Sequence, residues 1–221
     1  MLLTVAHGTR DPAGIDTVSQ IVHGMRAARP VLDVRLAWIE LVPPDVRSAL
    51  AAIPSGRPVV LAPLLLSSGY HDRVDLPAVV RAVRPDSVRA PVLGPDRLLA
   101  TALADRLAEA GRRPADAVVL AAAGSSDPAA VAAVREQAAL LAEALGVPVT
   151  VGFGSAASPD VPTAVAAARA EAGRVAIAPY LLAPGFFAAR LGQAGADLVA
   201  APLGAHPAVV ELVLRRFAAA R

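Results

Sequence analysis

The chain has 221 residues, of which 55% are apolar and only 3% aromatic, and it contains no cysteine. These values predict one or two domains with cores of Ala, Val and Leu, and they exclude disulfides and thiolate metal sites. The net charge is +2 and all 21 basic residues are Arg, but these are scattered and lack aromatic stacking partners, so we expect no nucleic-acid partner.

Short apolar runs alternate with longer Ala- and Arg-rich segments along the first half of the chain. This alternation predicts parallel strands joined by crossover helices, and runs that are apolar on both faces are typical of a sheet covered on both sides. The predicted strands are 2–6, 32–40, 58–66 and 88–92. The predicted helices are 14–28, 44–52, 74–83 and 96–110.

The second half repeats this order after a Gly-Arg-Arg-Pro stretch at 111–114, which indicates a short linker. We therefore expect an α/β fold of two tandem Rossmann-like or flavodoxin-like domains with parallel sheets, residues 1–112 and 113–221. The predicted strands of the second domain are 117–122, 148–153, 175–182 and 198–201. Its predicted helices are 128–145, 161–172, 186–194 and 207–219.

Targeting and membrane signals are missing from the predicted elements. No run of about 18 uncharged apolar residues occurs, so we predict no membrane span and no membrane partner. Residues 1–7 have no basic region ahead of a long apolar stretch, which argues against a signal peptide and for a buried first strand. Together with the lack of cysteine, this favours a cytoplasmic location.

An internal duplication relates the two halves. Residues 6–12 read Ala-His-Gly-Thr-Arg-Asp-Pro, and residues 122–128, which lie 116 positions later, read Ala-Ala-Gly-Ser-Ser-Asp-Pro. Residues 62–71 align with 178–187 at the same spacing. Glycines, prolines and apolar residues survive in both copies, because the fold needs them twice.

The ionisable residues survive in one copy only. His7 is opposite Ala123, and His71 is opposite Phe187. A single reactive site needs its ionisable residues in only one of the two copies. We therefore expect the first domain to carry the catalytic and metal-binding residues, and the degenerate second domain to form the other wall of a cleft.

Three consecutive predicted strands end in ionisable residues, namely His7, Glu40 and His71. Parallel α/β sheets bind ligands at the carboxyl ends of their strands, although strand order decides how closely these residues meet. Two imidazoles and a carboxylate are a common ligand set for Fe, Co, Ni or Zn. A single histidine is more often a core or surface residue, but all three are lost in the second copy, where Glu40 falls near Ser155. The pattern favours a metal site.

Residues 7–12, the pair Glu40-Leu41 and residues 63–77 resemble the sirohydrochlorin chelatase family of the CbiX/SirB type, in its long two-domain form. The resemblance implies a chelatase-like fold and a lyase that inserts a divalent metal into sirohydrochlorin or a related tetrapyrrole, on the routes to sirohaem or cobalamin. It implies His7, His71 and Glu40 as metal-binding and catalytic residues. Thr9 stands where many members have Ser, which keeps the hydroxyl.

The metal is then a substrate, ferrous or cobaltous ion with nickel as a further candidate, and no permanently bound cofactor is expected. Metal insertion removes two pyrrole N–H protons, and a histidine can hold a metal or accept a proton near neutral pH. Glu40 can orient an imidazole, bind the metal or relay the proton. These three roles stay open at the level of the sequence.

Candidate substrate-binding residues flank the two histidines. Arg10 and Arg73 can pair with the eight carboxylates of sirohydrochlorin, with surface salt bridges to neighbouring Asp residues as the alternative. Gly8 and Gly69 allow close approach of the backbone to a ligand. Ser68 can donate a hydroxyl, with turn formation or helix capping as its other role.

Aromatic residues could meet the flat macrocycle. Tyr70 and Trp38 are candidates for stacking on it, with a core position as the alternative for Trp38. Phe186 and Phe187 would offer apolar surface from the second domain.

Two other functions fit parts of the pattern. A non-catalytic metal or tetrapyrrole carrier could use the same site, although retention of Glu40 with both histidines favours an enzyme. A nucleotide-binding protein is disfavoured, because no GxGxxG or GxxxxGK[ST] run follows a predicted strand. The internal pseudo-symmetry removes the need for dimerisation, so we expect a monomer, with a dimer as the alternative.

Overall fold

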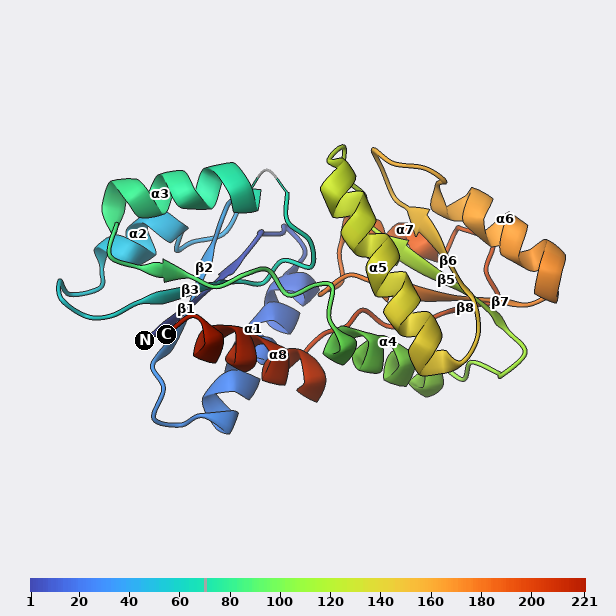
Figure 1. Ribbon diagram of the computed structural model, residues 1–221, viewed down its shortest axis with the longest axis horizontal. Coiled ribbons are helices and arrows are strands. Elements are labelled where there is room, and N and C mark those ends of the chain that lie inside the picture. The colour runs from blue at the N-terminus through green and yellow to red at the C-terminus, as the bar shows by residue number, and fades with distance from the viewer. Residues whose placement is uncertain (70) are drawn as a thin grey trace. The chain divides into compact units, whose positions relative to one another are not determined.

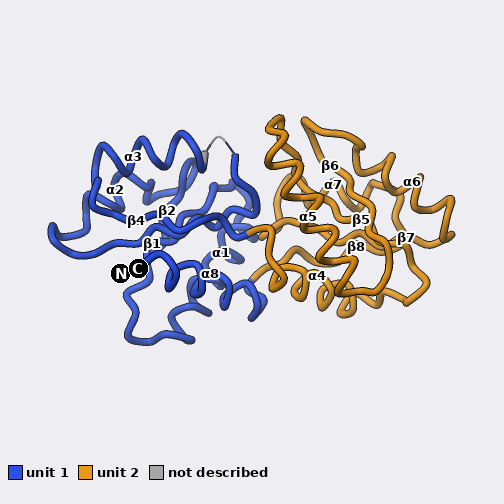
Figure 2. The backbone as a smooth tube through the Cα atoms, in the orientation of Figure 1, with its two compact units in different colours: residues 1–93, 205–221 blue, residues 94–204 orange. Residues whose placement is uncertain are grey.

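The computed structural model describes residues 1–69 and 71–221, and for His71 it describes the backbone alone. The chain divides into two compact units, residues 1–93 with 205–221 and residues 94–204 (Figure 2). Each unit contains a four-stranded parallel sheet. The predicted α/β fold with two parallel sheets is therefore confirmed.

The first sheet has the order β2-β1-β3-β4, and its central strand β1 is buried along its whole length. Helices α2 and α3 cover one face, while α1 and α8 lie on the other (Figure 1). The strands of this unit are β1 (Leu2–Ala6), β2 (Val34–Trp38), β3 (Val60–Pro63) and β4 (Val88–Arg89). Its helices are α1 (Pro12–Ala28), α2 (Val46–Ala51), the π-helical segment η1 (His71–Asp75), α3 (Leu76–Val83) and α8 (Pro207–Ala219).

The second sheet has the equivalent order β6-β5-β7-β8. Helix α6 packs on β5 and β6 around an Ala- and Val-rich core, and α4 packs on α5 and β7. The strands are β5 (Ala117–Ala122), β6 (Val149–Phe153), β7 (Val175–Tyr180) and β8 (Leu198–Val199). The helices are α4 (Arg97–Glu109), α5 (Pro128–Leu145), α6 (Val161–Ala172) and α7 (Phe186–Leu191).

Strand register reproduces the spacing of the sequence repeat. Leu3 pairs with Leu61 in the first sheet, and Val119 pairs with Ile177 in the second, each partner lying 116 positions after its counterpart. The helix starts also repeat. The side chains of Asp11 and Asp127 accept hydrogen bonds from the first turns of α1 and α5, with Pro at the first helical position.

The compact units differ from the halves that the repeat predicts, residues 1–112 and 113–221. Helix α4 follows the first sheet in the chain but buries Leu99, Leu103 and Leu107 within the second unit. Helix α8 follows the second sheet but packs on α1 and β3 of the first unit. A repeat identifies matching residues, whereas the sheet that a helix covers is set by packing.

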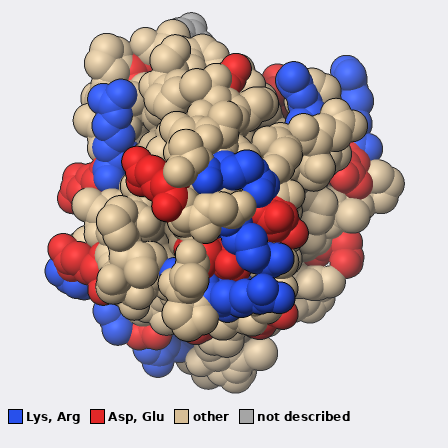
Figure 3. Space-filling model, turned by 90° about the vertical axis from the view of Figure 1, so that its right-hand side faces the viewer, with Lys and Arg blue, Asp and Glu red and all other residues tan. Residues whose placement is uncertain are grey.

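Charged side chains of both signs are intermixed on the face shown in Figure 3, and most of that face is uncharged. Several arginines of the second unit are held in ion pairs. Arg169 pairs with Asp197 at 2.8 Å and Arg174 pairs with Asp116 at 3.1 Å. Hydrogen bonds from the Arg113 backbone and from Arg174 hold the pKa of the Asp116 carboxyl below its ordinary value.

Gly8 follows β1 with φ of +115°, and a Cβ atom there would lie 2.0 Å from the carbonyl oxygen of Glu40. Gly124 repeats this geometry in the second unit, with φ of +96° and the carbonyl oxygen of Ser155 at 1.9 Å. No side chain fits at such a distance. We expected Gly8 to allow the backbone to approach a ligand closely. The observed close approach is instead to the backbone of Glu40, and glycine is needed for it in both copies.

We predict that Gly8→Ala lowers the free energy of unfolding by about 3 kcal/mol, because it combines an unfavourable φ with a backbone clash. Gly124→Ala should cost a similar amount. Gly56→Ala is the matched control, since φ is +77° there and an added Cβ meets nothing within 4 Å; it should cost about 1 kcal/mol. Urea denaturation measures all three. A Gly8→Ala cost no larger than that of Gly56→Ala would contradict the clash.

Candidate functional site

His7 and Glu40 are brought together by an extension of the β1–β2 pairing. Backbone hydrogen bonds run from Ile39 N–H to Ala6 O (2.8 Å) and from Glu40 N–H to His7 O (3.0 Å), beyond the ends of both strands. The His7 Nδ1 and Glu40 Oε1 atoms are 3.4 Å apart, and each side chain is about half exposed, at 49% and 47%. His7 and Glu40 lie at the same carboxyl edge of the sheet, and the strand order, which the sequence left open, brings them close together.

The loop that carries Glu40 is held at both ends. Trp38 N–H donates to Pro44 O (3.0 Å) and Val42 N–H donates to Glu40 O (2.8 Å). Asp45 caps α2 by accepting from the backbone N–H and the hydroxyl of Ser48, which lowers the pKa of the Asp45 carboxyl. Glu40 thus stands on a short loop with a defined path, two residues beyond the end of β2.

The strand order places β1 between β2 and β3, so the segments that follow β2 and β3 flank His7. The backbone of His71 opens η1, in the segment after β3, but its side chain lies outside the described structure, as does Tyr70. Among the described side chains, no group of three or more His, Asp or Glu residues forms a metal site. Of the three predicted ligands, the structure brings His7 and Glu40 together, and the side chain of His71 lies outside the described residues.

A buried ion pair lies directly after His71. The Asp72 side chain is 6% exposed and pairs with the guanidinium of Arg89 on β4. Arg89 also donates to the Asp72 backbone oxygen (3.0 Å), and Ser68 Oγ donates to Asp72 Oδ2 (2.6 Å). Ser68, predicted as a substrate donor or turn residue, thus binds within the chain. Sequence reasoning missed Asp72 and Arg89, although both are replaced by apolar residues in the second copy.

The remaining predicted substrate residues lie near this edge. Arg10 is exposed and forms no ion pair with any residue in the described part of the chain. Arg73 is exposed as well, and an added Cβ at Gly69 would meet nothing within 4 Å. Trp38 is 3% exposed, so it is a core residue and does not offer a ring for stacking.

The second copy has a pocket at the equivalent strand ends, lined by apolar side chains and by Asp160, Arg190 and Gln193. Ser155 takes the place of Glu40, and its hydroxyl donates to Ala123 O (3.0 Å). The Phe187 ring packs beside Gly154 and lines a pocket of about 250 Å³ with Leu181. The degenerate copy thus keeps the backbone of the site, with Ser155 in place of Glu40 and Phe187 in place of His71.

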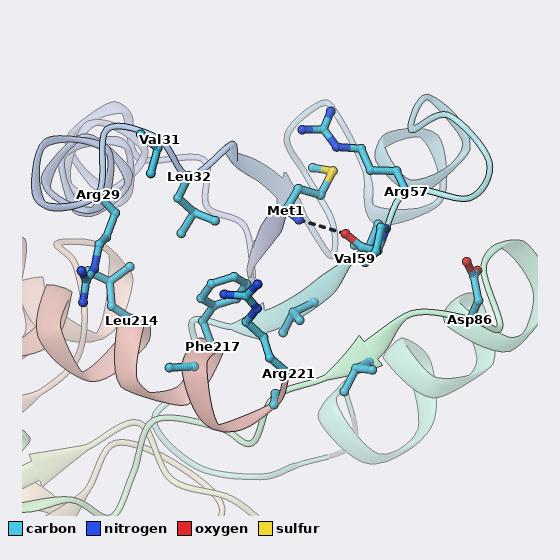
Figure 4. A pocket seen from close by; sticks show the side chains of 15 residues that line it. Met1, Arg29, Val31, Leu32, Arg57, Val59, Asp86, Leu214, Phe217 and Arg221 are labelled. Atoms are coloured by element: carbon cyan, nitrogen blue, oxygen red, sulfur yellow. Dashed lines mark hydrogen bonds between the residues drawn. The ribbon is translucent and has the colours of Figure 1, made fainter.

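A cavity of about 1000 Å³ lies at the other end of the first sheet (Figure 4). Arg29, Arg57 and Arg221 surround apolar side chains that include Leu32 and Phe217. It adjoins the amino ends of β1, β3 and β4, whereas parallel sheets bind ligands at the carboxyl ends of their strands. We therefore do not assign this cavity to the candidate site.

Comparison with known proteins identifies the family. A family model described as CbiX matches residues 1–110 and again residues 117–220. The chain belongs to the CbiX/SirB sirohydrochlorin chelatase family. The two matches correspond to the two copies of the internal repeat, so this class II chelatase is the two-domain form that the sequence motifs predict.

Solved structures share the fold over nearly the whole chain. SirB from Bacillus subtilis with Fe³⁺ has a TM-score of 0.86 at 25% identity, over 98% of this chain and 93% of that one. The sirohydrochlorin chelatase SirB from Bacillus subtilis subspecies spizizenii, in complex with cobalt, has a TM-score of 0.79 at 23% identity, over 97% and 92%. CbiX, the terminal enzyme of siroheme biosynthesis in denitrifying bacteria, has a TM-score of 0.73 at 24% identity, over 100% and 99%.

The last two likenesses, below 25% identity, show the fold alone. None of the curated proteins matches the chain. Among its described residues, this chelatase family member has no helix that is long and apolar enough to cross a membrane.

We predict that Arg89→Val lowers the free energy of unfolding by about 3 kcal/mol, because it leaves the buried Asp72 carboxylate without its cation. The double variant Arg89→Val/Asp72→Ala removes both charges and should lose about 1 kcal/mol. Urea denaturation followed by circular dichroism measures both variants.

The matched control for Arg89→Val is an exposed pair, Arg97 with Glu143, whose side chains are 76% and 57% exposed. Arg97→Ala should change stability by less than about 0.5 kcal/mol, as exposed pairs usually do. If Arg89→Val costs no more than Arg97→Ala, the buried pair does not stabilise the segment after β3.

Proposed function

We propose that this protein inserts ferrous or cobaltous ion into sirohydrochlorin or a related tetrapyrrole, and that His7, His71 and Glu40 carry the reaction. Membership of the chelatase family supports the reaction class. The observation that carries the assignment of residues is the approach of His7 Nδ1 to Glu40 Oε1 at the carboxyl edge of the first sheet. The second copy builds the same edge without these groups.

The reaction exchanges protons for a metal. The divalent ion forms four bonds to the pyrrole nitrogens, two N–H bonds break, and the two protons pass to bases on the protein or to water. Glu40 faces Nδ1 of His7, an arrangement that fixes the ring and its tautomer and leaves Nε2 to hold the metal or accept a proton. Of the three roles open to Glu40, we propose orientation of the imidazole.

The metal must also leave the protein during each turnover. Histidine ligands without thiolate bind such ions less tightly than a closed thiolate site does. The half exposure of His7 and Glu40 keeps the pair accessible to an incoming ion. Iron and cobalt share this ligand set, so both are tested below.

The carboxylates of the macrocycle need cationic partners. We propose Arg10 and Arg73 for this role, with Gly69 and Tyr70 beside them. The support for Arg10 is its exposure three residues after His7 and its freedom from ion pairs within the described structure. Ser68 is less suited to the macrocycle, because its hydroxyl already donates to Asp72.

We predict that His7→Ala and His71→Ala each lower kcat/KM for metal insertion by about 100-fold or more, because each removes a ligand or base. Glu40→Gln should lower it by about 10-fold or more through loss of ring orientation. Absorbance of the macrocycle under anaerobic conditions, with ferrous and cobaltous ions against the uncatalysed rate, provides the measurement.

His23→Ala is the matched control for these variants, since His23 lies on α1 of the same unit and, among the described residues, its side chain bonds to Ser19 O alone. It should keep the full rate. Wild-type protein that binds the macrocycle without accelerating insertion of either ion would overturn the enzyme in favour of a carrier.

We predict that Arg10→Ala raises KM for sirohydrochlorin by about 10-fold with little change in kcat, because a carboxylate partner contributes to binding. Steady-state kinetics at varied macrocycle concentration measure the effect. Arg29→Ala is the control, since Arg29 is exposed at the opposite end of the first sheet. Equal KM values for both variants would argue against a role for Arg10.

A further inference from the structure

We propose that Asp72 is a positioning residue for His71, and that Ser68 and Arg89 hold Asp72 in place for this purpose. We call these three residues the Asp72 clamp. The proposal deepens the proposed function, and rests on it in one respect, the role of His71 in binding the metal.

The clamp ties the start of η1 to two other parts of the first unit. Ser68 reaches Asp72 from the segment after β3, at 2.6 Å, and Arg89 reaches it from β4. Arg89 contacts both the backbone oxygen and the side chain of Asp72, so the backbone as well as the carboxylate is held. The peptide that joins Asp72 to Arg73 is therefore held, one residue after the proposed ligand.

The second copy shows that the fold does not require the clamp. Ser68 corresponds to Pro184 and Asp72 to Ala188, at the spacing of 116. Arg89 pairs with Leu61 in the sheet, and Val199 pairs with Ile177 at the equivalent place. All three members are thus lost where His71 becomes Phe187, while strand order and register are kept. The clamp is therefore present where the histidine is present, and it is not needed for the strand order and register that both copies share.

The local backbone differs between the copies at the same place. Residues 71–75 form a π-helical turn, whereas the matching segment of the second copy lies in the α-helix α7. π-Helical turns are rare and occur often at functional sites. The clamp holds Asp72 within this turn, at the position next to residue 71.

A ligand that must bind and release a metal gains from such support. Residues that orient a metal ligand commonly change metal affinity by 10- to 100-fold when they are replaced. Replacement of a buried charge pair by apolar residues is often neutral or stabilising, so stability alone does not account for the pair. Retention of the charged version beside His71 is explained by placement of the ligand.

The test converts the clamp into its counterpart from the second copy. Asp72→Ala/Arg89→Val removes both charges, which avoids an unpaired buried group. The control is Asp116→Ala/Arg174→Val, which removes an ion pair of similar burial in the second unit, with side chains 2% and 40% exposed. The protein is titrated with Co²⁺ alone, read by its visible ligand-field absorbance, and the melting temperature of each variant is measured.

We expect Asp72→Ala/Arg89→Val to fold, to bind Co²⁺ about 10-fold or more weakly and to show an altered absorbance band. The control variant should keep the wild-type affinity and band. A folded clamp variant with wild-type affinity and band would overturn the proposal. A purely structural clamp would lower the melting temperature and leave the Co²⁺ spectrum of the folded protein unchanged, which would also overturn it.

Two further variants separate this proposal from the proposed function. If His7→Ala and His71→Ala leave Co²⁺ binding unchanged, the metal site itself is wrong; if they weaken it and the clamp variant does not, only the clamp is wrong. If the clamp variant does not fold, the Co²⁺ affinity of Ser68→Ala tests the proposal instead. A loss of affinity by threefold or more that Ser68→Thr restores supports the clamp, and an unchanged affinity overturns it.

Discussion

The close approach of two backbone segments determines the geometry of this protein's site. The residue after β1 lies so near the carbonyl of Glu40 that only glycine fits, and the pairing of β1 with β2 continues past both strands to produce this contact. His7 and Glu40 face each other because their main chains are joined there. The same contact exists in the second unit between Gly124 and Ser155, so it belongs to the fold, and the proposed chemistry would use a position that the fold already provides.

Duplication has allowed the two copies to serve different purposes. In the first unit, the carboxyl edge of the sheet carries His7 and Glu40, and a buried charge pair supports the segment of His71. At the equivalent edge of the second unit, Phe187 lines a pocket. Comparison of the two copies shows which residues the packing of the fold requires, since these recur in both. It also shows which residues can differ between the copies without a change of fold.

Much of the fold could be predicted, because glycines, prolines and buried runs recur in both halves of the chain and mark most of the strands and helices. The positions of His7 and Glu40 at strand ends predicted a shared edge of the sheet, whereas their close approach depends on a strand order that the sequence does not show. The pairing of Asp72 with Arg89 was not predicted, because a lone Arg in a short strand looks like a surface residue until its partner is seen. The exchange of α4 and α8 was equally hidden, since the apolar faces of both helices would suit either sheet.

That exchange determines the order in which the units can be completed during synthesis. The second unit is one continuous segment, residues 94–204, whereas the first needs residues 205–221 to cover the face of its sheet beside α1. On the ribosome, the unit that begins first must therefore wait for its last helix, and the unit that begins second can close before it. Until α8 emerges, the sheet that carries His7 and Glu40 has one apolar face only partly covered, which makes the early chain the stage most exposed to aggregation.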